Sequence, residues 1–450
     1  MSTIDSPCAT DIRAILDKQR AACLAREPYS AEQRCELIDR AIGLLVEHEQ
    51  EIVDALTADF GHRTAAFTRA SEVLSPLATL KQTKSDLIEW MKPQSRATAA
   101  GEAWVQYQPL GVVGIVTAWN VPGNMVFKGL AGALAAGNRV MIKPSEYTPH
   151  TSALIARLIG SVYEQDEVAV ITGDARVGQA FCAQPFDHLL FTGATGIGKH
   201  VLRAAAENLV PVTLELGGKS PVILSRSADF KSAVAKIVIG KLHNAGQLCV
   251  APDYVFVPEE SVDDFIAVAR QVVARVYPTL MDNPDYTSVI NQRHYERLLD
   301  YLSEARLAGV ALEELNPANE DFRRTEQRKV VPTLLIDPAD HLQVMQEEIF
   351  GPLLVIKPYK DLEQTLTFIN ARPRPLALYY FGDDAAEEAR VLARTCSGGV
   401  TVNEVMHHAA LESLPFGGVG ASGMGAYHGI DGFRTFSHAR AVFRAPVNKA

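Results

Sequence analysis

Residues 111–144 read GVVGIVTAWNVPGNMVFKGLAGALAAGNRVMIKP, and this stretch decides the fold. It begins with a short apolar run rich in β-branched residues, which predicts a buried strand. Gly, Ala and Leu then dominate up to Gly137 and predict a closely packed helix. The run RVMIK, from Arg139, predicts a second strand. A strand, a helix and a strand in this order indicate a crossover between parallel strands.

The same alternation continues towards the C-terminus. VAVITG (168–173) and HLLFTG (188–193) predict strands, and residues 152–161 and about 197–208 predict helices. Strands separated by helices at this spacing indicate an α/β fold of the Rossmann type, with a parallel sheet covered on both faces. The sheet restarts at PVTLELGGKSPVILS (211–225), which predicts a border between two α/β domains, 1–212 and 213–425.

The first ninety residues have a helical pattern instead. Ser30-Ala31-Glu32-Gln33 has the form of a capping box, the signature of a helix start. Apolar residues then recur at helical spacing: Leu37, Ile38, Ala41, Ile42, Leu45 and Val46. Pro93 and the basic segment QSRATAAGE (94–102) end this region.

Composition excludes several classes of protein. The 450 residues predict two large domains or three smaller ones. A net charge of -10 gives no electrostatic reason to bind nucleic acid or anionic lipid. The uncharged stretch 103–127 contains Gln, Asn, Pro and Gly, which are poorly tolerated in lipid, so we expect no membrane span.

The cysteines and the N-terminus indicate a cytoplasmic protein. The six cysteines form no CxxC pair and have no regular spacing, which is typical of a reducing compartment and of neither a zinc site nor a disulfide framework. No signal peptide is visible in MSTIDSPCATDIRAIL. The His407-His408 pair lacks a third ligand at metal spacing, so we expect no metal.

Two segments that follow strands are candidate ligand sites. FTGATGIG (191–198) joins a strand to a helix, where backbone N–H groups can face a phosphate; a tight turn without a ligand explains it equally well. Its spacing is GxxGxG rather than GxGxxG. Lys143 and Glu146 follow the strand RVMIK, at the edge where open α/β sheets bind ligands. Taken alone, the Lys and Glu are more simply an exposed ion pair.

Three further residues are candidates for chemistry. Glu215 ends an apolar strand, where burial would raise its pKa towards the range of a general base; the alternative is a carboxylate satisfied by backbone N–H groups. Cys249 lies in a loop-like break in HNAGQLC (243–249), and His243 suggests a Cys–His dyad, although a lone cysteine is more often a small buried hydrophobe. Asn120 ends a strand, where its amide can stabilise an oxyanion or simply form a turn.

The order of the motifs identifies a family. WN, KPSE, FTG, ELGGK, GQxC, EEIFGP (347–352) and LPFGGVGASGMG (414–425) follow one another over some three hundred residues. This order resembles the NAD(P)-dependent aldehyde dehydrogenase superfamily over nearly the whole chain. The ending GMGAYHGIDGFRTFSHAR (423–440) resembles the class 3 branch, which is typically homodimeric. Within that branch TADFGHR (57–63), NPDYTS (283–288) and NARPRPLALYYFG (370–382) are most similar to coniferyl aldehyde dehydrogenases.

The resemblance implies a role for each candidate. Cys249 is the expected nucleophile, Asn120 the oxyanion donor and Glu215 the base that activates the hydrolytic water. The residues expected at NAD are Trp119, Lys143, Glu146, Gly193, Gly198, Glu348 and Phe350. Glu146 disfavours the phosphate of NADP by charge repulsion, without excluding it. The expected domains are a cofactor domain (1–212), a catalytic domain (213–425), and a dimerisation ribbon made from 97–109 and the tail 426–450.

Three departures and three alternatives accompany this assignment. Ala118 stands where the family often has Pro, Ala194 where it often has Ser, and Val121 where an aromatic residue is common. The last change bears on the coniferyl assignment more than on the chemistry. The alternatives are an acylating enzyme that uses coenzyme A, against which Glu215 argues; a silent cofactor-binding protein; and a Cys–His hydrolase.

Overall fold

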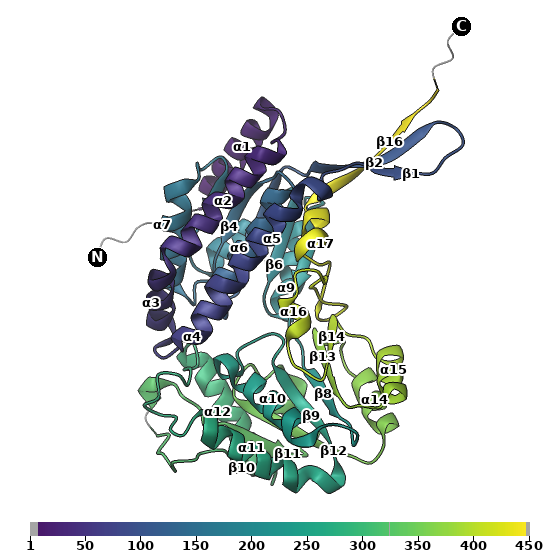
Figure 1. The fold of residues 1–450 in the computed structure, drawn as a ribbon. Coiled ribbons are helices and arrows are strands. Elements are labelled where there is room, and N and C mark those ends of the chain that lie inside the picture. Colours follow the sequence, from purple (N-terminus) through teal and green to yellow (C-terminus); the bar gives the residue numbers. More distant parts are fainter. Residues whose placement is uncertain (1–7, 324, 447–450) are drawn as a thin grey trace.

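The computed structural model describes residues 8–323 and 325–446. They form two lobes, each around its own sheet, and a thin ribbon of strands extends from the first lobe (Figure 1). The sheet of the first lobe has the order β15-β7-β6-β3-β4-β5. Its strands are β3 (Val112–Val116), β4 (Arg139–Lys143), β5 (Val168–Val170), β6 (His188–Thr192), β7 (Val212–Glu215) and β15 (Gly423–Met424). All are parallel except β15, which runs antiparallel to β7.

Helices cover both faces of this sheet. On one face lie α2 (Ala31–Glu47), α3 (Glu49–Phe60), α5 (Ser75–Trp90), α6 (Pro122–Ala135) and α7 (Pro149–Val162). On the other lie α1 (Ala9–Ala25), α8 (Ala175–Cys182) and α9 (Thr195–Ala206). A short helix α4 (Ala65–Thr68) leads through a π-helical turn (Arg69–Leu74) into α5. The expected capping box at Ser30 is present at the start of α2.

The strand pattern explains these two layers. Val113 and Ile115 of β3 belong to the hydrophobic cluster under α2 and α6, whereas Val112 packs with the cluster under α1 and α8. Alternate residues of a strand point to opposite faces, so a run of apolar residues has to be covered on both sides. The predicted doubly covered parallel sheet is therefore confirmed.

The second lobe has a seven-stranded sheet of order β10-β11-β12-β9-β8-β13-β14, parallel except for the edge strand β10. Its strands are β8 (Ser220–Leu224), β9 (Pro252–Pro258), β10 (Ala311–Glu314), β11 (Thr333–Ile336), β12 (Leu353–Tyr359), β13 (Ala377–Phe381) and β14 (Gly399–Val402). Its helices are α10 (Phe230–Leu242), α11 (Val262–Val276), α12 (Gln292–Leu307), α13 (Gln343–Gln346), α14 (Leu362–Asn370), α15 (Ala385–Arg394) and α16 (His407–Ala410). The helix α17 (Gly429–Thr435) returns to the first lobe and packs on α5 and α6.

The ribbon has three strands, β1 (Gln94–Arg96), β2 (Glu102–Pro109) and β16 (Ser437–Arg444), in the order β1-β2-β16. Part of the predicted segment 97–109 pairs with the C-terminal tail, since Trp104 lies opposite Val442 and Gln108 opposite His438. The last part of the predicted tail, 447–450, lies outside the described residues.

The predicted border between the two sheets is wrong by a few residues. Strand β7 pairs with β6 and completes the first sheet, so the chain changes sheets between Glu215 and Ser220. Strand β15, near the end of the predicted second domain, also joins the first sheet. Both errors have one cause: the pattern of a buried strand does not say which sheet the strand will join.

Among the described residues, no helix combines the length and the apolar character needed to cross a bilayer. In the same part of the chain, no three His, Cys, Asp or Glu side chains group as a metal site would require. His408 is buried against Thr401, with 2.7 Å between Nδ1 and Oγ1.

Candidate active site

Four candidate segments lie at one edge of the first sheet. Asn120 follows β3, Lys143 ends β4, Gly193 follows β6 and Glu215 ends β7. These strands are parallel neighbours, so their carboxyl ends meet at the same edge. The chain starts at β3 and adds β4 on one side and β6 on the other, which creates the switch point where open α/β sheets bind ligands.

The second lobe contributes the opposite ends of two strands. Cys249 lies just before β9 and Glu348 just before β12, and these two strands are parallel neighbours. The loops before them touch each other, since a Cβ on Gly246 would come within 2.2 Å of the carbonyl oxygen of Gly351. Gly246 also has φ = 74°, a conformation that favours glycine. The strand ends of two separate sheets therefore supply one site.

An unusual backbone shapes the loop that carries Cys249. Asn244 and Ala245 both adopt the left-handed region, with φ of 50° and 52°, an arrangement that is rare for residues other than glycine and that occurs at functional sites. The buried Gln247 side chain holds the loop in place. Its amide donates to the carbonyl oxygens of Asn244 (2.9 Å) and Ser288 (3.1 Å), and its oxygen accepts from the Ile290 N–H (3.0 Å).

The thiol of Cys249 and the carboxyl group of Glu215 shift each other's pKa. Burial raises the pKa of Glu215 to about 7, and interactions with Cys249 and Thr192 oppose part of that shift. The pKa of Cys249 is raised well above its usual range by burial first, and then by the negative charges of Glu215 and Glu348. Oε1 of Glu215 is buried without a hydrogen-bond partner. A carboxyl group with such a pKa can take up a proton near neutral pH, and this one interacts with a thiol.

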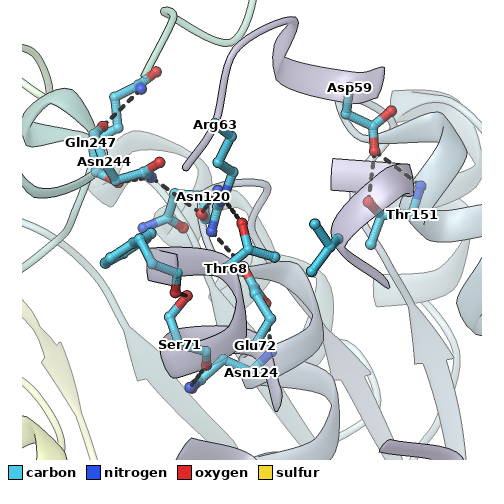
Figure 2. A network of polar contacts seen from close by, with 12 residues as sticks. Asp59, Arg63, Thr68, Ser71, Glu72, Asn120, Asn124, Thr151, Asn244 and Gln247 are labelled. Atoms are coloured by element: carbon cyan, nitrogen blue, oxygen red, sulfur yellow. Dashed lines mark hydrogen bonds and ion pairs between the residues drawn. The ribbon is translucent and has the colours of Figure 1, made fainter. Parts of the chain in front are cut away.

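Asn120 presents an unused donor. It is 1% exposed, and its side-chain Nδ2 has no hydrogen-bond partner. Its backbone carbonyl, in contrast, accepts from Arg63 (2.8 Å) and from Asn244 in the nucleophile loop (3.3 Å; Figure 2). A buried amide donor without a partner is costly, so its presence here fits a group that will donate to developing negative charge.

Glu348 lies against the diglycine of ELGGK. A Cβ on Gly217 would fall 2.0 Å from its Oε2 atom, so the carboxylate reaches this position only because residue 217 has no side chain. Burial, followed by the charge of Asp253, raises the pKa of Glu348 to about 8, while the backbone N–H of Gly218 lowers it in part.

Polar contacts fix the turn that contains Glu348. Lys219 of ELGGK binds Asp253 and donates to the carbonyls of Val344 (2.7 Å) and Glu347 (3.0 Å). Arg297 holds the carbonyls of Glu348 (3.0 Å) and Ile349 (2.8 Å).

An aromatic group lies beside this turn. The rings of Trp119 and Phe350 meet edge to face with their centroids 5.3 Å apart. The ring of His294 lies 5.1 Å from that of Trp119, and its Nδ1 is buried without a partner. Sequence reasoning missed His294, because a lone histidine on a helix carries no local signal. Phe350 itself has φ = 50°, a strained position in the turn.

The remaining candidates lie at the ends of β4 and β6 and in α9. Lys143 Nζ lies 3.5 Å from Glu146 Oε2, and the Lys is buried whereas the Glu is exposed. Gly193 donates its N–H to the Glu215 carbonyl (3.1 Å). Gly198 allows α9 to pack closely, since a Cβ there would fall 2.8 Å from Leu216. Ala194, the N-cap of α9, makes no side-chain cap hydrogen bond, and its carbonyl accepts from the N–H groups of Ile197 (3.0 Å) and Gly198 (2.9 Å).

His243 is not arranged as the partner of Cys249. Its side chain is exposed and its ring packs against Phe67 at 5.9 Å between centroids. The charged groups that shift the pKa of Cys249 are two carboxylates. The geometry therefore argues against the Cys–His hydrolase.

Comparison with known proteins identifies relatives over the whole fold. Residues 1–442 match the model of the aldehyde dehydrogenase family. The chain is 53% identical to a probable coniferyl aldehyde dehydrogenase of Caulobacter vibrioides, with 96% of this chain and 90% of that protein covered. It is 50% identical to a coniferyl aldehyde dehydrogenase of a Pseudomonas species (98% and 92%). It is 38% identical to aldehyde dehydrogenase family 3 member A2 of Macaca fascicularis (94% and 86%).

Solved structures agree with these relatives. The substrate-bound state of Staphylococcus aureus AldH superposes with a TM-score of 0.92 at 36% identity, covering 98% of this chain and 95% of that one. The aldehyde dehydrogenase of Mycobacterium tuberculosis complexed with NAD+ has a TM-score of 0.88 at 26% identity, with coverage of 99% and 92%. The family resemblance of the motifs, the class 3 likeness and the predicted fold are all confirmed.

Proposed function

Because this chain belongs to the aldehyde dehydrogenase family, whose members are NAD(P)-dependent oxidoreductases acting on aldehydes, we propose that it oxidises its aldehyde to the carboxylic acid through a thioester on Cys249. The observation that supports this mechanism is the contact between the Cys249 thiol and the Glu215 carboxyl group. Beside it stands Asn120, whose Nδ2 is buried without a partner and whose backbone carbonyl binds Asn244 in the nucleophile loop.

The residues around the site fit a dinucleotide. Glu348, seated on Gly217, would hold the nicotinamide ribose, and the Trp119–Phe350 pair would flank the ring. Lys143 and the exposed Glu146 would hold the adenosine ribose at the end of β4, and the turn from Gly193 to Gly198 would lie by the pyrophosphate. The charge of Glu146 favours NAD over NADP, because the 2′-phosphate would lie beside a carboxylate. When bound, the cofactor accepts the hydride that leaves the substrate carbon.

The chain's own residues carry out the other steps. The thiol of Cys249 releases its proton to water as its sulfur adds to the aldehyde carbonyl, and Nδ2 of Asn120 with the N–H of Cys249 stabilises the resulting oxyanion. After oxidation the acyl group remains on sulfur as a thioester. Glu215 takes a proton from water, the hydroxide attacks the thioester carbonyl, and the carboxylic acid leaves while the thiol is restored. A pKa of about 7 suits Glu215 to this second step.

The substrate we propose is an aromatic aldehyde such as coniferaldehyde, with medium-chain aliphatic aldehydes as the second class. The support is the identity of 53% and 50% to proteins named as coniferyl aldehyde dehydrogenases, one of them as probable. We also propose a homodimer assembled through the ribbon of β2 and β16, and a cytoplasmic location. The latter rests on six cysteines that are all free in the described chain.

The test is the formation of NADH or NADPH by the purified protein with coniferaldehyde, benzaldehyde, hexanal and acetaldehyde, each with NAD and with NADP. Cys249→Ala is expected to form no NADH, whereas Cys396→Ala, at an exposed cysteine, should match the parent protein. Glu215→Gln is expected to release NADH once per site and then stop.

Three results would contradict the proposal. If Cys249→Ala turned over as the parent does, Cys249 would not be the nucleophile. If turnover required coenzyme A and the product were its thioester, the acylating alternative would hold. If every aldehyde failed with both cofactors although the protein bound NAD, the chain would be the silent cofactor-binding protein.

A further inference from the structure

A buried ion pair lies behind Asn120, and the proposed mechanism does not use it. Arg63 and Glu72 meet with 2.6 Å between Nη2 and Oε1, and both side chains have no exposed surface. Arg63 is the last residue of the TADFGHR motif, and Glu72 lies in the π-helical turn between α4 and α5. Removing one partner of such a pair leaves an uncompensated buried charge, but apolar residues of similar volume in place of both would often be equally stable. A buried pair therefore calls for an explanation beyond stability. π-Helical turns inside α-helices occur frequently at functional sites.

All three nitrogens of the Arg63 guanidinium donate hydrogen bonds. Nε donates to Thr68 Oγ1 (3.2 Å), Nη1 to the carbonyl of Asn120 (2.8 Å) and Nη2 to Glu72 (Figure 2). The planar fork fixes the direction of each bond, which a lysine ammonium cannot do. The backbone of Asn120 is thereby attached to a charged group whose own position is fixed on three sides.

Glu72 holds the other end of the same turn. Its Oε2 accepts from the N–H of Asn124, in the first turn of α6, at 2.9 Å. Gly123 permits this approach, since a Cβ there would fall 3.1 Å from Oε2. A carboxylate at a helix N-terminus is favourable for the helix dipole. One ion pair therefore holds the strand-to-helix turn on both sides of Val121 and Pro122.

The same carbonyl connects to the nucleophile loop. Asn244 Nδ2 donates to the oxygen of Asn120 (3.3 Å) and to that of Gln247 (3.2 Å), two residues before Cys249. The carbonyl of Asn120 is thus fully occupied, while its side-chain Nδ2 stays unpartnered. These contacts fix the backbone of Asn120 and leave its side-chain amide without a partner.

We propose that Arg63 and Glu72 are positioning residues that hold the side-chain amide of Asn120 where negative charge develops on the substrate oxygen. This inference rests on the proposed role of Asn120. A donor that is already oriented loses no free energy in reorganising during the reaction, so a small displacement of Asn120 is expected to lower kcat rather than substrate binding.

The first variant is Arg63→Lys, which keeps a positive charge beside Glu72 but cannot bind Glu72, Thr68 and the Asn120 carbonyl together. We expect kcat to fall about tenfold or more, the range for a misplaced oxyanion donor, while the KM for aldehyde and the Kd for NAD change little. The double variant Arg63→Gln with Glu72→Gln removes both charges and should lower kcat similarly, and it replaces Arg63→Lys if that protein does not fold.

The matched control is Arg34→Gln. Arg34 is also a buried arginine that holds α6, but it donates to the carbonyl of Ala135 at the far end of the helix (2.8 Å). An effect through the stability of α6 alone would appear in both arginine variants, whereas an effect through Asn120 would leave kcat of Arg34→Gln near that of the parent.

The decisive measurement is a double-mutant cycle with Asn120→Ala. If Arg63 acts through Asn120, Arg63→Lys lowers kcat strongly in the parent protein but by less than about twofold once Asn120 is Ala. Equal fold-losses in the two backgrounds, or an equal loss in Arg34→Gln, would overturn the positioning role and leave the proposed function intact. A normal kcat in Asn120→Ala alone would overturn the oxyanion role of Asn120 and the positioning role with it.

Discussion

At the scale of single residues, the candidate site contains a carboxyl group whose pKa lies near 7. Glu215 is 1% exposed and ends a strand that is hydrogen-bonded on both sides, by β6 and by β15. Burial raises its pKa from 4.5 to about 7 because the charged form loses its hydration. An ordinary exposed glutamate would be fully ionised at pH 7 but a weaker base.

The pKa of Glu215 predicts the pH dependence of the second chemical step. The base form predominates above pH 7, so the release of the acyl group after the NADH burst should slow about tenfold for each pH unit below the pKa and level off above it. Single-turnover measurements from about pH 5.5 to 8.5 test this. A release rate that is flat down to pH 5.5 would show that Glu215 is not the base.

Two residues show what sequence reasoning missed at this scale. Arg63 belongs to a motif that the sequence analysis quoted, yet its contact with Asn120, 57 positions away, has no local signal. The contact between the rings of His294, in the second lobe, and Trp119, in the first, has no local signal either. The chemistry of a residue is visible in the sequence, whereas its partner is not when the fold brings the two together from distant segments.

At the scale of elements, the glycines of ELGGK set the geometry of the site. Gly218 has φ = 146°, a conformation that lets the chain turn from β7 into β8. Gly217 leaves space for the carboxylate of Glu348. The motif therefore ends one sheet, begins the next and admits a residue from a third segment. The sequence predicted a domain border just before this motif, but not the approach of Glu348.

Gly217→Ala tests this geometry. A Cβ would displace the Glu348 carboxylate, so we expect the KM for NAD to rise about tenfold, as for the loss of one hydrogen bond to a charged group. The control is Gly160→Ala, because a Cβ on Gly160 in α7 meets no atom within 4 Å. It should leave the KM unchanged and stabilise the helix by up to about 1 kcal/mol. An unchanged KM in Gly217→Ala would remove Glu348 from the cofactor site.

At the scale of the whole molecule, the two lobes are joined by a common hydrophobic core as well as by the candidate site. One hydrophobic cluster runs from the helices of the first lobe into α10 and α11 of the second. The segment after α3 links them as well, since Phe60 and His62 accept hydrogen bonds from Arg328 (3.0 Å) and Ser288 (2.8 Å). This continuity keeps the strand ends of the two sheets at a fixed distance.

The ribbon leaves the body of the first lobe (Figure 1), and most of the side chains of β16 are exposed. Phe443, for example, is 55% exposed. Exposed apolar groups on an edge strand favour pairing with a second chain.

Removal of residues 437–450 is therefore expected to convert the proposed homodimer into a single chain, measured by light scattering after size exclusion. Thermal unfolding of the truncated protein serves as the control that its lobes remain folded. A two-chain mass after truncation would contradict assembly through the ribbon.

Strands, helices and candidate catalytic residues were predictable from the sequence. Local periodicity marked the strands and the crossover helices, a capping box marked the start of α2, and the ordered motifs supplied the nucleophile, the base and the oxyanion donor as candidates. These features depend on neighbouring residues, so they are readable along the chain.

Which strands share a sheet, and which distant groups come into contact, became visible only in the folded molecule. β7 and β15 join the first sheet although they lie beyond the predicted border, and Arg63 with Glu72 meets Asn120. The physical reason is that a buried strand has the same pattern in either sheet, and that a buried polar contact is selected by the space and partners that the folded core leaves for it.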